Sequence, residues 1–437
     1  MAHELRVRRV PRRPRSRVHT TRRQLAVPEG VARQALRIPI TNVYGGGDYT
    51  ASILVGRKGQ NANVILDTGS STLAVTKQAY DPAKDTTPPR PTALAQVILY
   101  GTGGWAGPVL GTQVSLGGLV LTGAQIAVAL DQEENNFGAA GGILGLAYNA
   151  LNPASNTGKP TYPWNFAVKG TQNALIAFEN ELGHDPTTDV DPYFSQMASK
   201  GVVANKFAFY TLRSFPRVTN TNASLSTLAN DPSNQGFLIL GGGDDPTEAD
   251  LYTGNFANVL VVDDLYYNVN LKSVQVVGGG PEIQAAALQS QYLQEAGSNA
   301  IVDTGTNCLV LAPDVFAAVV NSLQAVNPTF PQLLESTQPV PVNQLNLGSW
   351  PNIVFTLQGQ TGNVALTVTP QTYWQVDTPG PNVATPVVYG QPAQSPNQSI
   401  LGLPLLNNYY AVFDRSTGTG VIRFAPIKTP SSGERDK

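Results

Sequence analysis

The sequence contains one cysteine and only three histidines among its 437 residues. The single cysteine, Cys308, cannot form an internal disulfide, and it excludes zinc sites built from several thiolates. Two of the histidines, His3 and His19, lie in a basic N-terminal stretch, so a Ser-His-Asp or Cys-His site would depend on His184 alone. We therefore expect no metal site, no cofactor and no nucleophile of the serine or cysteine class.

Charged residues are also scarce, at 13% of the chain, and no apolar run is long enough to cross a membrane as a helix. Glycine, with 42 residues, and proline, with 33, are abundant, which favours strands and turns over long helices. The length is sufficient for two lobes with separate cores. We expect no phosphate-binding loop, because Gly101 and Gly103 lie in a predicted hairpin and not before a helix.

Two segments far apart in the chain share one unusual pattern. Residues 64–70 and residues 300–306 each begin with a short apolar run and end in Asp-Thr-Gly followed by a hydroxyl residue. The apolar run predicts a buried strand, and glycine permits a sharp turn at its end. A carboxylate at the end of a buried strand is costly to keep charged. Two copies in one chain therefore indicate a functional pair, Asp67 and Asp303.

The repeat continues downstream of each motif. Residues 143–146 and residues 400–403 both read Ile-Leu-Gly-Leu, at a comparable distance from the preceding aspartate. A repeat of this length indicates two related lobes and not a solenoid, because stacked arrays need three or more short units. We predict a pseudo-twofold pair of lobes whose aspartates meet at the interface, where pockets commonly form.

Two aspartates within hydrogen-bonding distance can hydrolyse an amide without a metal or a covalent intermediate. Like charges repel in a poorly solvated site, so the pair shares one proton. The ionised partner takes a proton from an attacking water, and the protonated partner donates one to the carbonyl oxygen. We expect the hydroxyls of Ser70 and Thr306 to hydrogen-bond the outer carboxylate oxygens, and Thr68 and Thr304 to lock the two loops together.

These motifs resemble the two active-site sequences of the pepsin-like aspartic proteases, and the similarity covers roughly residues 38–426. The resemblance implies a mostly β, bilobal fold, with two β-barrel-like lobes related by a pseudo-twofold axis, a central cleft and a few short helices. Further segments similar to the family occur in the family's order, at residues 100–103, 206–210, 237–242, 351–355 and 410–415.

The resemblance also implies an activity and the residues that perform it. It implies an aspartic endopeptidase for protein or peptide substrates, monomeric and sensitive to pepstatin-type inhibitors, with a preference for hydrophobic residues around the scissile bond and for acidic pH. A mobile, glycine-rich hairpin tip suits a flap that closes over the peptide. The expected site residues are Asp67 and Asp303 as catalytic groups, Thr68, Gly69, Ser70, Thr304, Gly305 and Thr306 as their support, and Tyr100, Gly101 and Thr102 on the flap.

The chain departs from the family in two places. Most members carry a tryptophan where Ala74 stands, and that indole binds the flap tyrosine; the sequence leaves open whether Trp105 compensates. Residues 149–191 form an insertion relative to the usual family length, with a helix predicted over residues 173–182, and the sequence leaves open whether the insertion has a role at the rim of the cleft. Further helices are predicted near residues 192–200 and 313–319.

We predict four regions along the chain, namely an Arg-rich leader at residues 1–37, an N-terminal lobe at 38–212, a C-terminal lobe at 213–426 and a disordered tail at 427–437. The leader holds eleven arginines and two acids, which leaves residues 38–437 with a net charge of −11. The leader is either a basic tail without fixed structure or, as in zymogens of the family, a propeptide that pairs with the acidic cleft at neutral pH. Without aromatic residues between its arginines, it predicts no nucleic-acid partner.

Two further alternatives concern the compartment and the activity. The lack of a signal peptide and of disulfides favours a cytoplasmic protein, whereas the acidic body and the habit of the family favour secretion or an acidic compartment. The rival to an enzyme is a catalytically silent member of the same fold that acts as a binding or inhibitor protein. Silent members usually lose an aspartate or fill the glycine, and both Asp-Thr-Gly sequences are intact here.

Overall fold

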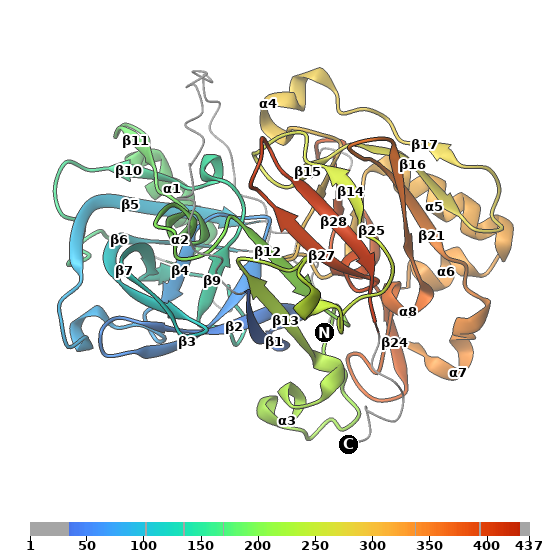
Figure 1. Cartoon of the computed structure of the whole chain (residues 1–437), viewed down its shortest axis with the longest axis horizontal. Coiled ribbons are helices and arrows are strands. Elements are labelled where there is room, and N and C mark those ends of the chain that lie inside the picture. Colours follow the sequence, from blue (N-terminus) through green and yellow to red (C-terminus); the bar gives the residue numbers. More distant parts are fainter. Residues whose placement is uncertain are drawn as a thin grey trace.

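The computed structural model describes residues 35–100, 103–133, 136–168, 170–336, 338–392 and 395–428. These residues form two lobes, built mainly of strands, that lie side by side (Figure 1). The predicted mostly β, bilobal architecture is confirmed. Almost all of the predicted Arg-rich leader, and residues 429–437 of the predicted disordered tail, lie outside the described residues. The first two residues of that tail are ordered, because Ile427 forms a bridge with Tyr252 and the backbone N–H of Lys428 donates to the carbonyl of Leu251.

The N-terminal lobe consists of hairpins that stack into one curved sheet. Its helices are α1 (Gln172–Leu182) and α2 (Tyr193–Ser199), close to the predicted positions. Its strands are β1 (Leu36–Gly45), β2 (Asp48–Val55), β3 (Gln60–Asp67), β4 (Leu73–Thr76), β5 (Arg90–Tyr100), β6 (Gly103–Leu116), β7 (Leu119–Ala129), β8 (Asp131–Gln132), β9 (Gly142–Gly145), β10 (Pro153–Asn156) and β11 (Thr187–Asp189).

The sheet continues from the first lobe into the second without a break. β1 pairs with β13, and β12 joins β13 to β27, so that strands from the two ends of the chain lie between the lobes. β28 and β14 complete this edge. The strands are β12 (Lys206–Tyr210), β13 (Gln235–Leu240), β14 (Ala257–Leu260), β27 (Tyr409–Asp414) and β28 (Val421–Pro426).

The C-terminal lobe consists of three smaller sheets with helices on its outer side. Its helices are α4 (Leu293–Ala296), α5 (Pro313–Val326), α6 (Phe330–Leu334), α7 (Val342–Leu345), α8 (Pro370–Tyr373) and α9 (Leu403–Leu406). Its strands are β15 (Asn268–Val269), β16 (Leu271–Val276), β17 (Ile283–Gln284), β18 (Ala300–Val302), β19 (Leu309–Leu311), β20 (Val340–Pro341), β21 (Ile353–Gln358), β22 (Asn363–Val368), β23 (Trp374–Val376), β24 (Val383–Pro386), β25 (Val388–Gly390) and β26 (Ser399–Leu401).

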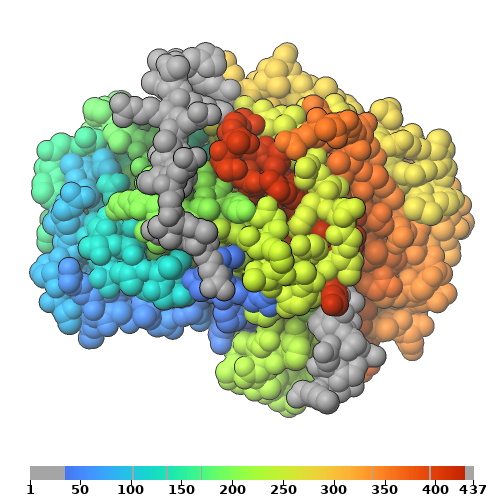
Figure 2. Space-filling view, in the orientation of Figure 1, coloured from blue at the N-terminus to red at the C-terminus, as the bar shows by residue number. Residues whose placement is uncertain are grey.

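The segment between β12 and β13 projects from the molecule. It contains the short helix α3 (Leu225–Ala229), which stands out at the lower edge of the space-filling view (Figure 2). No helix within the described ranges is long and apolar enough to span a membrane.

The strand pairing around the two Asp-Thr-Gly motifs is the same in both lobes. In the N-terminal lobe β3 runs parallel to β9, β9 antiparallel to β4, and β4 parallel to β7. In the C-terminal lobe β18 runs parallel to β26, β26 antiparallel to β19, and β19 parallel to β25. The sequence repeat is therefore a structural repeat, and each aspartate follows the equivalent strand of its lobe.

The glycine of each Ile-Leu-Gly segment is required by close packing against the Asp-Thr-Gly loop. A methyl group on Gly145 would lie 2.4 Å from the backbone nitrogen of Ser71, and one on Gly402 would lie 2.2 Å from the carbonyl oxygen of Thr306. Both contacts are with backbone, which cannot rotate away. Any other residue would thus push the strand off the loop, which explains why the sequence repeats this glycine with the aspartate.

Candidate active site

Asp67 and Asp303 are both fully buried, and each is held by the same two hydrogen bonds from its own loop. The backbone N–H of Gly69 donates to Oδ1 of Asp67 at 2.7 Å, and the hydroxyl of Ser70 donates to Oδ2 at 2.6 Å. In the second loop Gly305 donates to Oδ1 of Asp303 at 2.9 Å, and Thr306 donates to Oδ2 at 2.7 Å. The tight turn after each strand thus fixes both oxygens of each carboxylate.

The two carboxylates face each other across the loops. A methyl group on Gly69 would lie 2.6 Å from Oδ2 of Asp303, and a methyl group on Gly305 would lie 2.2 Å from Oδ1 of Asp67. Each glycine therefore makes room for the aspartate of the opposite lobe. Neither position tolerates a side chain without movement of a carboxylate.

Burial and the neighbouring charge of Asp67 hold the pKa of Asp303 well above its usual range. The hydrogen bonds from Thr306 and Gly305 oppose this shift, because they stabilise the ionised form, but they are the smaller effect. The pair therefore titrates as a unit and retains one proton where isolated carboxyl groups would both be ionised.

Thr68 and Thr304 link the two loops in a symmetric arrangement. The backbone N–H of Thr68 donates to Oγ1 of Thr304 at 3.0 Å, and the backbone N–H of Thr304 donates to Oγ1 of Thr68 at 2.9 Å. Each hydroxyl in turn donates to a carbonyl oxygen of the opposite strand, Thr68 to Val302 at 3.1 Å and Thr304 to Leu66 at 2.9 Å. These four bonds, all buried, fix the position of one aspartate relative to the other.

The predicted flap is the hairpin of β5 and β6. Tyr100 ends β5 and pairs with Gly103 at the start of β6, while Gly101 and Thr102 at the tip lie outside the described residues. Tyr100 is buried in an apolar cluster with Ile65 and Ile143. These two residues are opposite each other in the paired strands β3 and β9, and Ile65 lies two residues before Asp67.

Trp105 binds the flap tyrosine, which settles a question that the sequence left open. Its indole Nε1–H donates to the hydroxyl of Tyr100 at 3.1 Å, and its ring is fully buried in the same cluster as Ala74. A tryptophan of the flap itself therefore provides the donor that Ala74 cannot provide. The position of Trp105, five residues after Tyr100, is the one signal in the sequence for this contact, but which side chain occupies the space beside Ala74 depends on strand packing.

A third buried carboxylate, which the sequence did not single out, lies near the second loop. Asp48 at the start of β2 has no exposed surface, and its charge acts on Cys308, just after the second motif. Burial, with smaller contributions from Asp48 and Asp303, raises the pKa of the Cys308 thiol far above its usual range. The thiol is therefore neutral, as expected for a buried apolar side chain.

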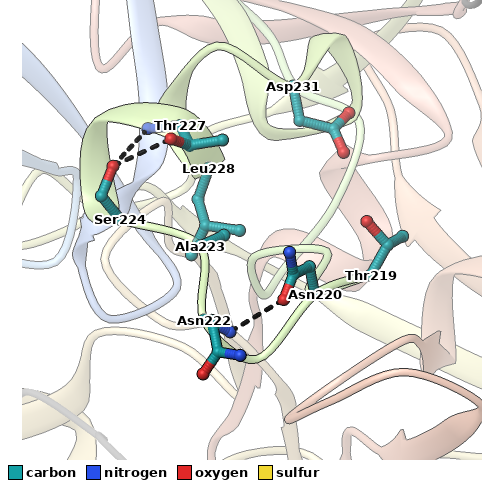
Figure 3. Close-up of a pocket in the computed structure, with 8 residues that line it drawn as sticks. All are labelled: Thr219, Asn220, Asn222, Ala223, Ser224, Thr227, Leu228 and Asp231. Carbon is teal, nitrogen blue, oxygen red and sulfur yellow. Dashed lines mark hydrogen bonds between the residues drawn. The ribbon is translucent and has the colours of Figure 1, made fainter.

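A hollow that is separate from these loops lies beside α3. It has a volume of about 480 Å³ and a largely polar lining (Figure 3), formed by Thr219, Asn220, Asn222, Ala223, Ser224, Thr227, Leu228 and Asp231. None of these residues belongs to the aspartate loops or to the flap. Among the described residues, no group of three His, Cys, Asp or Glu side chains lies close enough together to hold a metal ion.

Comparisons with known proteins agree with this geometry. A sequence model of the family described as eukaryotic aspartyl protease matches residues 48–169 and 187–427. Cathepsin E of Cavia porcellus is 26% identical over 409 residues, covering 90% of this chain and 84% of that protein. The vacuolar aspartic protease of Candida albicans is 24% identical over 405 residues, covering 89% and 77%, and pepsin-2B of Gadus morhua is 26% identical over 397 residues, covering 87% and 96%. The chain therefore belongs to the eukaryotic aspartyl protease family of aspartic-type endopeptidases.

Proposed function

We propose that Asp67 and Asp303 activate a water molecule to hydrolyse a peptide bond of a substrate bound between the two lobes. The observation that carries this proposal is the mutual approach of two buried carboxylates, each held by two hydrogen bonds from its own loop. A purely structural pair of this kind would be costly, because both carboxyl groups are removed from water and one repels the other.

The chemistry follows from the shared proton. Burial and the charge of Asp67 raise the pKa of Asp303, so we assign the shared proton to Asp303 and the role of base to Asp67. Asp67 takes a proton from the water as its oxygen attacks the carbonyl carbon, and Asp303 donates its proton to the carbonyl oxygen. When the tetrahedral diol collapses, the proton on Asp67 passes to the amide nitrogen, the C–N bond breaks and one hydroxyl proton of the diol returns to Asp303. The products are a carboxylic acid and an amine, and the pair again holds one proton.

The surrounding residues support this chemistry without taking part in proton transfer. Thr68 and Thr304 fix the distance between the loops, while Gly69 and Gly305 leave space for the opposing carboxylates. Tyr100 lies on the hairpin that would close over an extended peptide. We also propose a preference for large hydrophobic side chains next to the scissile bond, which membership of the family implies.

We propose an acidic pH optimum, because catalysis needs one proton on the pair. Both carboxyl groups become ionised at high pH and both become protonated at very low pH, so the rate should follow a bell-shaped profile. The raised pKa of Asp303 extends the singly protonated form toward neutral pH.

The test follows purified full-length protein after a shift from pH 7 to about pH 4, which is close to the ordinary pKa of an aspartate side chain. Peptide cleavage and intact mass are measured together, with and without pepstatin. We expect pepstatin-sensitive cleavage that Asp67→Asn abolishes. The matched control is Asp189→Asn, at an exposed carboxylate of β11, which should retain full activity.

Each outcome decides between the alternatives. Full activity of Asp67→Asn would refute the assigned chemistry, and a folded protein that cleaves nothing at any pH would indicate a silent binding protein. Loss of the Arg-rich leader at the onset of cleavage would support a propeptide, whereas cleavage by the intact chain would exclude that role.

A further inference from the structure

The flap hairpin has two buried faces, because successive side chains of a strand point to opposite sides. Ile98, Tyr100 and Trp105 lie on the face that packs with the strands of the first aspartate. Leu99 and Ala106 lie on the other face and belong to a separate apolar cluster. The register agrees, since Ile98 is opposite Trp105 in the hairpin. Both faces of the flap hairpin are therefore packed against other parts of the lobe.

The cover of this second face is helix α1. Leu175, Phe178 and Leu182 are its buried residues, and their spacing places them along one side of the helix. They pack with Leu99 and Ala106 of the flap, and Figure 1 shows α1 beside β5 and β6. The apolar side of α1 is therefore buried against the flap hairpin, and this contact stabilises the helix.

An aromatic group ties the segment before α1 to the same hairpin. The rings of Trp164 and Phe166 lie 5.8 Å and 5.3 Å from that of Phe178. The indole Nε1–H of Trp164 donates to Oδ2 of Asp131 at 2.7 Å, and Asp131 is the β8 residue opposite Ala106 in β6. The segment is therefore anchored both to the flap and to the strand beside it.

Two glycines show how closely this segment packs against the hairpin near the flap tip. A methyl group on Gly104, the second residue of β6, would lie 3.0 Å from Cδ1 of Leu175. A methyl group on Gly170 would lie 2.1 Å from the carbonyl oxygen of Gln132, the β8 residue opposite Trp105. The match to the family model is interrupted between residues 169 and 187, so α1 lies outside the segments that the family model matches.

We propose that residues 161–168 and 170–182, here called the brace, hold the flap hairpin from its outer face and set how often it is closed over the substrate. Leu175 and Phe178 are positioning residues in this proposal, because they act on Tyr100 through the hairpin and touch no reacting atom. The expected change in kinetics rests on the proposed function, whereas the contact between the brace and the flap is independent of it.

The expected effect is on substrate binding more than on the chemical step. If the brace keeps the flap almost fully closed, apparent affinity falls in proportion when the closed fraction falls. A decrease of the closed fraction to about one tenth raises KM about tenfold, which corresponds to about 1.4 kcal/mol. The value of kcat should stay within about twofold, because a substrate that is bound still meets the same closed site.

The experiment compares wild type with Leu175→Ala/Phe178→Ala by steady-state kinetics and by hydrogen exchange of β5 and β6. We expect KM to rise about tenfold and the amides of residues 95–107 to exchange faster. Trp164→Phe keeps the ring and removes the hydrogen bond to Asp131, so it should produce a smaller change in the same direction in a fully folded protein.

Three control variants separate the brace from general stability. Ile176→Ala alters the exposed side of α1 and should change neither measurement. Leu121→Ala removes a buried side chain from the main core, which contains neither Leu175 nor Phe178, and should lower Tm without raising KM. Leu175→Met nearly conserves the volume of the side chain and should retain wild-type kinetics.

The outcomes distinguish this inference from the proposed function. KM and exchange both within about twofold of wild type in the folded double variant and in Trp164→Phe would overturn the brace. A rise in KM for Leu121→Ala equal to that of the double variant would overturn it as well. If the protein cleaves no peptide, the proposed function fails, and the exchange of β5 and β6 still tests whether the brace holds the flap.

Discussion

Replacement of Thr68 by valine tests the link between the two loops most directly, because valine has nearly the same shape but no hydroxyl. The change removes the acceptor of the Thr304 N–H and the donor to the Val302 carbonyl. Both backbone groups lie where the surrounding side chains are fully or almost fully buried, so water cannot easily replace the lost partner. Each unsatisfied buried group costs about 1–3 kcal/mol, so the loss should total about 2–6 kcal/mol.

The control for this prediction is Thr68→Ser, which retains both hydrogen bonds and loses only a methyl group worth about 1 kcal/mol. Urea unfolding at pH 7, followed by tryptophan fluorescence, gives the free energy of unfolding of both variants. We expect Thr68→Val to be the less stable by at least about 1 kcal/mol and to lose peptide cleavage, because the aspartates are no longer held together. Equal stability of the valine and serine variants would refute the argument that these bonds join the lobes.

Three further predictions concern the carboxylates and the flap. The pKa of Asp303 is raised in the folded chain, so its contribution to stability is present below the unfolded pKa and is lost as pH rises through the folded pKa. The Tm of Asp303→Asn minus the Tm of wild type should therefore be larger at pH 7 than at pH 4. A difference of the opposite sign would contradict this argument. Trp105→Phe removes the donor to Tyr100 and should lower kcat/KM about two- to tenfold, as expected for one hydrogen bond, whereas unchanged kinetics would exclude a positioning role. Gly69→Ala places a methyl group against Asp303 and should lower kcat about 100-fold or more in a protein that circular dichroism shows to be folded, so near-normal turnover would show that the carboxylate pair tolerates displacement.

The aspartate loops could be predicted from the sequence because their determinants are local. An apolar strand, an aspartate and a glycine are adjacent in the chain, and the hydroxyl of Ser70 reaches the carboxylate three residues before it. The second copy, ending in Thr306, has the same geometry. Even the distant glycines at positions 145 and 402 are visible as a repeat, since each must pack against the backbone of its own loop.

The flap could be located from the sequence, but its contacts could not be predicted. The sequence predicts a helix over residues 173–182, close to the observed α1, yet nothing in its pattern identifies the flap as its partner. The same holds for Trp105, whose indole reaches Tyr100 only because both side chains lie on one face of the twisted hairpin. Contacts of this kind depend on which strands are neighbours, and that is decided by the packing of the whole lobe.

The alternation of side chains along β5 connects these findings. Tyr100 and Leu99 are consecutive residues of one strand, so their side chains point to opposite faces of the two-stranded hairpin. Trp105 and Ala74 therefore act on Tyr100 from the inner face, while Leu175 acts on Leu99 from the outer face. A change in the insertion can then alter the position of Tyr100 without altering any residue beside the aspartates. In this chain, variation in α1 should affect substrate binding through the flap and leave the proposed proton chemistry of Asp67 and Asp303 unchanged.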